Sequence, residues 1–317
     1  MRFTEEDKKN IFISFIISAI LFLGAYFAIS ATGFSADELL TSLRAQNIQS
    51  GIAELGEGVF QQTKNRTSPE EFSVEGKVSE IFINISCPEL TVREYEGENI
   101  RISAEDGKYV SGPVVKTDDT SVEITSSYSH KTHIIAEIPE RIMRENSVKV
   151  SIKTKNGYVR IINFRDSADD DFIVDGETSI IKASSLNCRK LDITDTAAPV
   201  LIGDCAGRIL KVETEGMIDY TGSFEEISLQ GGLDVMALMT GDFNRIDASS
   251  ENGFVMIDTN GLAGGFTARL SGCSNDIAIR EEATLSSLSK PSYAVYEYGD
   301  GSSKINITDT KGKIIIN

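Results

Sequence analysis

Chemistry in this sequence would have to come from carboxylates, because the other common catalytic side chains are scarce. The chain has two histidines, His130 and His133, and four cysteines against 48 acidic residues. On a strand, residues three apart point to opposite faces, so His130 and His133 could not hold one metal ion together. Two histidines also leave little room for a histidine-based triad. We therefore predict no metal site and no cofactor.

A carboxylate enzyme acting on polysaccharides needs two acids about 5–5.5 Å apart, or about 6.5–9.5 Å apart in inverting enzymes. The repeat described below predicts two outward columns: Asp192, Lys211, Ser228, Asp247 and Thr267; and Thr194, Glu213, Gln230, Ser249 and Arg269. Asp192 and Asp247 would then lie three strands apart, about 14 Å. Neither column pairs two acids on neighbouring repeats, so we predict no catalytic residues and no enzyme activity.

Other sequence features offer little further chemistry. The acid-rich segment 166–176 fails the EF-hand pattern, because Ile173 takes a ligand position if Asp171 is first, although weak surface calcium binding stays open. Gly231-Gly232 and Gly264-Gly265 precede no predicted helix, so neither is a phosphate-binding loop.

The four cysteines are Cys87, Cys188, Cys205 and Cys273. Cys188 and Cys205 fall on neighbouring repeats but about two residues out of column. Their Cα atoms would lie about 8 Å apart, slightly beyond disulfide reach. We predict small buried thiols that fill the interior.

Charge excludes one class of partner. The formal net charge is −17 in 317 residues, with 48 acidic against 31 basic side chains. Nucleic-acid binding requires a basic patch for phosphate contacts, so this composition argues against it. Hydrophobic residues make up 40% of the chain, which suffices for a packed core.

The amino terminus predicts a membrane anchor. Residues 11–31 (IFISFIISAILFLGAYFAISA) carry no charge, and as a helix they would extend about 31 Å, the thickness of a bilayer interior. A cleaved signal peptide is the alternative, but its apolar region is usually shorter, about 7–15 residues. Arg2, Lys8 and Lys9 precede the span and only Arg44 follows closely. This places residues 1–10 in the cytoplasm and the rest outside the cell, anchored in the plasma membrane.

Between the span and the repeats, residues 32–71 are expected to form a short helical stalk and a linker. Ser35 and Glu38 fit a helix capping box, and apolar residues recur behind them at spacings of three to five. Residues 61–71 are polar, contain Pro69 and indicate a linker.

From Phe72 onwards the apolar residues alternate, which predicts strands and a mainly β domain over 72–317. Two apolar columns recur at intervals of about 19 residues, the signature of a β-solenoid whose stacked turns bury a continuous core. Antiparallel hairpins are the alternative, since Asn-Gly at 156–157 and 252–253 is also a hairpin signal. We expect glycines to mark corners with positive φ. The columns are Phe172, Leu191, Leu210, Ile227, Ile246 and Phe266; and Ile181, Val200, Ile218, Val235, Val255 and Ile277.

Four features carry a family resemblance: the opening strands at 78–85 and 90–93, the strand-then-proline element 134–139, the two repeat units 150–161 and 246–257, and the ending 299–316. In this order they resemble the bacterial family of candidate adhesins with β-strand repeats, which includes the LiaG-like proteins. The resemblance covers roughly 72–317. It implies an exported β-solenoid of unassigned role and supplies no catalytic residues.

Together these features predict a non-enzymatic, membrane-anchored interaction, adhesion or stress-sensing module of the bacterial cell envelope. Its expected partners are the bilayer, through residues 11–31, and a protein or another envelope component. A polysaccharide-acting β-helix enzyme and an accessory subunit of a membrane complex are the alternatives.

Overall fold

The computed structural model describes residues 69–317 apart from 75–76, 106–113, 119, 128–132, 146, 274–275, 287–288, 290–292 and 309. The chain divides into two compact units, Met1–Lys64 and Asn65–Asn317, and every described residue belongs to the second. No helix in this described part could cross a bilayer. The predicted span 11–31 and most of the predicted stalk and linker 32–71 lie outside the described residues, so they stay predictions.

The described part is mainly β, as the alternation predicts, and its strands form one hydrogen-bonded sheet of 21 strands. Its first strands are β1 (Glu70–Phe72), β2 (Glu80–Ser86), β3 (Glu89–Tyr95), β4 (Ile100–Glu105), β5 (Val114–Thr117), β6 (Ser121–Ser127) and β7 (His133–Pro139). The short helix α3 (Glu140–Glu145) follows β7. Because β1 begins at Glu70, strand structure starts two residues before the predicted boundary at Phe72.

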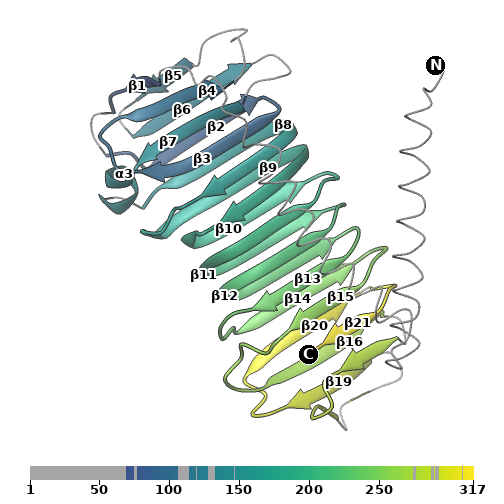
Figure 1. The fold of residues 1–317 in the computed structure, drawn as a ribbon. Coiled ribbons are helices and arrows are strands. Elements are labelled where there is room, and N and C mark those ends of the chain that lie inside the picture. Colours follow the sequence, from purple (N-terminus) through teal and green to yellow (C-terminus); the bar gives the residue numbers. More distant parts are fainter. Residues whose placement is uncertain are drawn as a thin grey trace, which may run out of the picture. The chain divides into compact units, whose positions relative to one another are not determined.

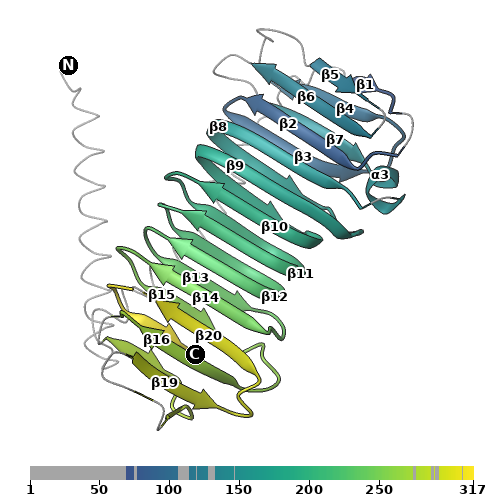
Figure 2. The same ribbon diagram turned by 180° about the vertical axis from the view of Figure 1, so that it is seen from behind.

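Eight strands build the middle of the molecule: β8 (Lys149–Ile162), β9 (Ser167–Ser184), β10 (Asn187–Asp195), β11 (Val200–Thr214), β12 (Ile218–Gly231), β13 (Val235–Met239), β14 (Arg245–Ser250) and β15 (Val255–Asp258). They pair in parallel, alternately in two ladders, and Figures 1 and 2 show them stacked in chain order. Ladder A contains β10, β14 and the halves of β8, β9, β11 and β12 that align with them. Ladder B contains β13, β15 and the other halves.

Both predicted apolar columns are confirmed through this middle region. In ladder A, Leu191 aligns with Phe172 and Leu210, and the column continues to Ile246. In ladder B, Val200 aligns with Ile181 on one side and with Ile218 on the other, and the column continues to Val255. Parallel pairing rules out the hairpin alternative here, since antiparallel pairs among the described strands involve only β1, β4 to β7, β16, β18 and β19.

The last strands depart from chain order. They are β16 (Phe266–Ser271), β17 (Ile277–Ile279), β18 (Thr284–Leu285), β19 (Tyr293–Tyr298), β20 (Ser303–Thr308) and β21 (Ile314–Ile316). β20 lies between β14 and β16, and β21 between β15 and β17. The predicted alignments of Ile246 with Phe266 and of Val255 with Ile277 are therefore wrong. A second reordering occurs at the other end of the sheet. There β2 lies between β6 and β8, and β3 lies between β7 and β8.

Inward residues of both ladders form one hydrophobic cluster that extends from Val74 to Ile316. Its aromatic members include Phe172, Phe224 and Phe266, each fully buried. A continuous core of this kind explains why the columns hold register, because a slip of one residue would turn an entire strand inside out.

The predicted positive φ is found at Gly272, Gly299 and Gly301 near the end of the chain, whereas the corner glycines of the middle strands serve another purpose. Positive φ at the corners of β8, β9 and β11 is adopted by non-glycine residues, among them Asn156 and Thr178. Gly207 and Gly222 are needed instead for close approach, since an added Cβ would lie 2.0 Å from the Cys188 carbonyl oxygen and 2.2 Å from that of Cys205.

Candidate functional site

The first outward column of ladder A is partly confirmed. Asp192, Lys211, Ser228 and Asp247 align as predicted, but the next residue is Asn306 of β20, and Thr267 aligns elsewhere. In the second column, Thr194, Glu213, Gln230 and Ser249 align as predicted. Thr308 then follows in place of Arg269. Both corrections have one cause, the insertion of β20.

A hollow of about 280 Å³ lies across β11, β12 and β14. We call it the face hollow. Ile209, which is 40% exposed, gives it an apolar side. Ser228 keeps it open, because this small residue lies between Lys211 and Asp247 in the outward column. Its lining residues are Ile209, Leu210, Lys211, Glu226, Ile227, Ser228, Arg245 and Asp247.

The face hollow is lined by two acidic residues, Glu226 and Asp247, of which the predicted columns contain only Asp247. Glu226 aligns with Arg245, two residues before Asp247, so the Cα atoms of Glu226 and Asp247 lie about 8 Å apart across neighbouring strands. The signal was present in the sequence: Lys190, Ile209, Glu226 and Arg245 form a third outward column at the same period, directly before the inward one.

The polar contacts of the face hollow favour binding over proton transfer. Arg245 Nε donates to Asp247 Oδ1 at 2.9 Å, and Asn306 Nδ2 donates to the same oxygen at 2.8 Å. Glu226 is exposed to solvent. A general acid in a glycosidase is usually held protonated by a dry pocket, and an open, solvated hollow does not provide one.

A second hollow, of about 360 Å³, lies beside the first at the carboxyl ends of β10, β11 and β12. We call it the corner hollow. It is acidic, with Glu213, Glu215 and Glu251 at its rim and the Lys211 ammonium 3.6 Å from Glu213. No group of acidic, histidine or cysteine side chains in the described part is arranged to hold a metal ion. The two hollows together form one surface on which charge of both signs is exposed.

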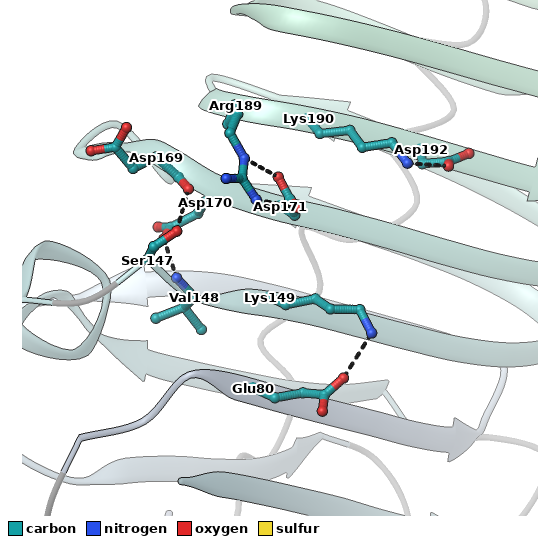
Figure 3. A network of polar contacts seen from close by, with 10 residues as sticks. All are labelled: Glu80, Ser147, Val148, Lys149, Asp169, Asp170, Asp171, Arg189, Lys190 and Asp192. Carbon is teal, nitrogen blue, oxygen red and sulfur yellow. Dashed lines mark hydrogen bonds and ion pairs between the residues drawn. The ribbon is translucent and has the colours of Figure 1, made fainter.

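Farther along ladder A, outward charges alternate in sign (Figure 3). Lys149 Nζ lies 2.8 Å from Glu80 Oε1, and Arg189 bonds both oxygens of Asp171, at 2.8 and 2.6 Å. Lys190 and Asp192 form a further pair at 2.8 Å. Each of these charges therefore has a partner of opposite sign on the same face.

The acid-rich segment 166–176 has a structural role. It contains a bulge, because β9 has three residues between Ser167 and Asp171 where β10 has one between Cys188 and Lys190. Within this bulge Asp170 turns inward, is almost fully buried and accepts a hydrogen bond from the Val148 amide at 2.6 Å. Burial raises the pKa of Asp170 to about 6. The segment therefore secures the start of β8.

A second perturbed carboxyl lies near α3. Glu94 is half-buried, and its Oε2 accepts a hydrogen bond from the Arg165 amide at 3.3 Å. Burial raises its pKa to about 7, and the nearby negative charges of Glu140 and Asp166 act in the same direction. Arg144 bridges those two acids, at 2.9 and 2.5 Å.

The structure places one of the two histidines and all four cysteines. His133 lies on β7, with its Nε2 2.9 Å from Thr91 Oγ1 and 3.8 Å from Glu89, whereas His130 is outside the described residues. Cys87, Cys188 and Cys205 are buried and unpaired in disulfides, as predicted. Cys273 differs, because it is half-exposed. Burial raises the pKa of Cys87 and of Cys205 to about 12, which keeps these thiols protonated.

Comparison with known proteins adds little to this geometry. No family model matches the chain, and no curated protein matches it. Among solved structures, a candidate cell adhesion protein from Clostridium sporogenes is similar, with 11% identity and a TM-score of 0.27. The match covers 80% of this chain and 98% of that one.

Proposed function

We propose that this protein is a non-enzymatic, single-pass membrane protein whose residues 72–317 form an extracytoplasmic β-solenoid that binds a component of the cell envelope. Parallel ladders with a period of about 19 residues support the solenoid. The LiaG-like resemblance and the anchor at 11–31 support an envelope location. Adhesion and stress sensing are the roles that such a module would serve.

The observation that carries the binding role is the pair of neighbouring hollows, the face hollow on β11, β12 and β14 and the corner hollow on β10, β11 and β12. They combine an apolar side chain, Ile209, with exposed charges of both signs. Binding sites on proteins commonly join an apolar contact area to a few polar groups that fix orientation. The carboxylates at the corner hollow favour a partner that presents basic groups, such as a protein segment rich in lysine or arginine.

A matched pair of variants tests this proposal in the intact, membrane-anchored chain. Ser228→Arg fills the face hollow, whereas Ser151→Arg places the same side chain in the same outward column, four strands away. Envelope components are crosslinked to each variant and identified by mass spectrometry. We expect Ser228→Arg to lose a component that the wild type and Ser151→Arg both retain. Equal crosslinking by all three proteins would contradict binding at the face hollow.

An enzyme acting on polysaccharides is the second candidate, and the closeness of Glu226 and Asp247 is what favours it. Their Cα atoms lie about 8 Å apart, a backbone separation from which the two carboxyl groups can reach the spacing of about 6.5–9.5 Å that inverting enzymes use. Release of reducing ends from purified wall polysaccharide, abolished in both Glu226→Gln and Asp247→Asn, would establish it. We expect no such release, because the hollow is open to water and Asp247 is held by Arg245 and Asn306.

A further inference from the structure

The last two strands of the chain are inserted between strands that precede them in the sequence. β14 and β15 are followed in the chain by β16 and β17, yet β20 and β21 separate the two pairs (Figures 1 and 2). We call β20 and β21 the inserted pair, and the space that they fill the slot.

Main-chain hydrogen bonds hold the inserted pair on both sides. Towards β14 and β15, the Lys304 amide donates to the Asn244 carbonyl at 3.0 Å, and the Gly312 amide donates to the Gly253 carbonyl at 3.1 Å. Towards β16 and β17, the Ser303 amide donates to the Gly265 carbonyl at 3.1 Å. The slot thus offers hydrogen-bonding groups on both walls, which is how a sheet recognises an added strand.

Alternate side chains of the inserted pair supply the apolar part of this recognition. Ile305 and Ile307 on β20, and Ile314 and Ile316 on β21, are fully buried in the core. Their neighbours in the ladders include Ile246 and Val255. None of these contacts requires the inserted pair to come from the same chain as the walls, because strand recognition depends on local pairing and register alone.

The connection to the inserted pair is a short hinge. Residues 299–302 cross the start of β16 between β19 and β20, with left-handed Gly299 at φ 60° and Gly301 at φ 67°. Asp300 Oδ1 fastens this turn by accepting a hydrogen bond from the Gly265 amide at 2.7 Å. Short, conformationally demanding hinges favour the exchange of an element between identical chains.

We propose that the slot of one copy binds residues 303–316 of a second copy of this chain, so that strand exchange links neighbouring molecules. This self-association is additional to the proposed binding of an envelope component. Exchange retains the ladder hydrogen bonds and the buried isoleucines of β20 and β21, and it costs the hydrogen bonds of the turn 299–302, such as that between Asp300 and the Gly265 amide, because this turn has to extend.

Cysteine crosslinking between two full-length populations tests this directly. Asp247 on β14 and Asn306 on β20 are register partners, so their Cα atoms lie about 4.8 Å apart, within disulfide reach. Asp247→Cys and Asn306→Cys variants, each with Cys273→Ser, carry different tags and are co-expressed and oxidised. We expect a covalent dimer that contains both tags.

Two controls make the result decisive. Lys304→Cys replaces Asn306→Cys in a matched mixture, and because residue 304 pairs with residue 245, its Cα lies about 8 Å from that of residue 247. We expect at least about tenfold less dimer from this mixture, since that separation exceeds disulfide reach. The double variant Asp247→Cys/Asn306→Cys reports the closed form by an intramolecular disulfide. Efficient intramolecular oxidation with no mixed dimer above the Lys304→Cys level would overturn the proposal.

Discussion

The carboxylate of Asp195 occupies the space that a side chain at Gly176 would need: a Cβ added to Gly176 would lie 2.2 Å from Asp195 Oδ2. The two residues are register partners on β10 and β9. Asp195 is buried and accepts hydrogen bonds from the amides of Ser179, Ala197 and Ala198 at 2.8–2.9 Å. One carboxylate therefore fixes two successive corners between the ladders.

Asp195→Ala is expected to lower the free energy of unfolding by about 3 kcal/mol, because three amides, two of them buried, lose their acceptor. Urea unfolding followed by circular dichroism measures it. Asp175→Ala is the matched control on the neighbouring strand, where an exposed carboxylate lies 3.8 Å from Lys153, and its change should stay within about 0.5 kcal/mol. If both variants lost the same free energy of unfolding, the hydrogen bonds from Asp195 to the corner amides would not be what stabilises the fold here.

Glu94 gives a prediction on pH. Its pKa is raised to about 7, so the folded state holds a proton that the unfolded state releases from about pH 4.5 upwards. Stability from this group is present at low pH and falls as the pH rises towards 7. Glu94→Gln removes this loss, and we expect it to stabilise the protein by about 1 kcal/mol at pH 8, a value reduced for the partial exposure of Glu94. The free energies of unfolding of the wild type and of Glu94→Gln should be equal at pH 4. If urea unfolding gave the same difference between them at every pH, the prediction would be contradicted.

Thiol reactivity should separate Cys273 from the other three cysteines. Cys273 is half-exposed, whereas Cys87, Cys188 and Cys205 are buried and their pKa values are raised by burial. Alkylation of the native protein at pH 8, read by mass spectrometry, should modify one thiol rapidly and the other three only in denaturant. Rapid native labelling of two or more thiols would be inconsistent with the packed interior.

The inserted pair should contribute to the same cooperative core as the middle strands. Ile305→Ala removes a fully buried side chain and is expected to cost about 3 kcal/mol in the free energy of unfolding. Leu285→Ala, at a residue that is 62% exposed, should change stability by less than about 0.5 kcal/mol. If Ile305→Ala were equally mild, β20 would not be buried between β14 and β16.

Sequence reasoning reached the outward columns but missed the face hollow. Asp192 and Asp247 were placed correctly, three strands apart, because a regular period specifies which residues share a column. Glu226 lies in the column directly before the inward one, whereas both predicted outward columns follow the inward one. The repeat also predicts which residues are neighbours but not the space left between their side chains, and the hollow depends on the small size of Ser228 between larger neighbours.

The sequence by itself determined the strand periodicity, the parallel columns from Phe172 to Ile246 and from Ile181 to Val255, and the burial of three thiols. These follow from local alternation and from a repeat whose neighbours in space are neighbours in the chain. Only the tertiary structure decided that Ile305 and Ile314 follow these columns. The strands that contain Ile246, Ile305 and Ile314 show the same alternation of apolar and polar residues, so the pattern does not reveal which strand lies beside which. The stacking order depends on packing and hydrogen bonding among all the strands.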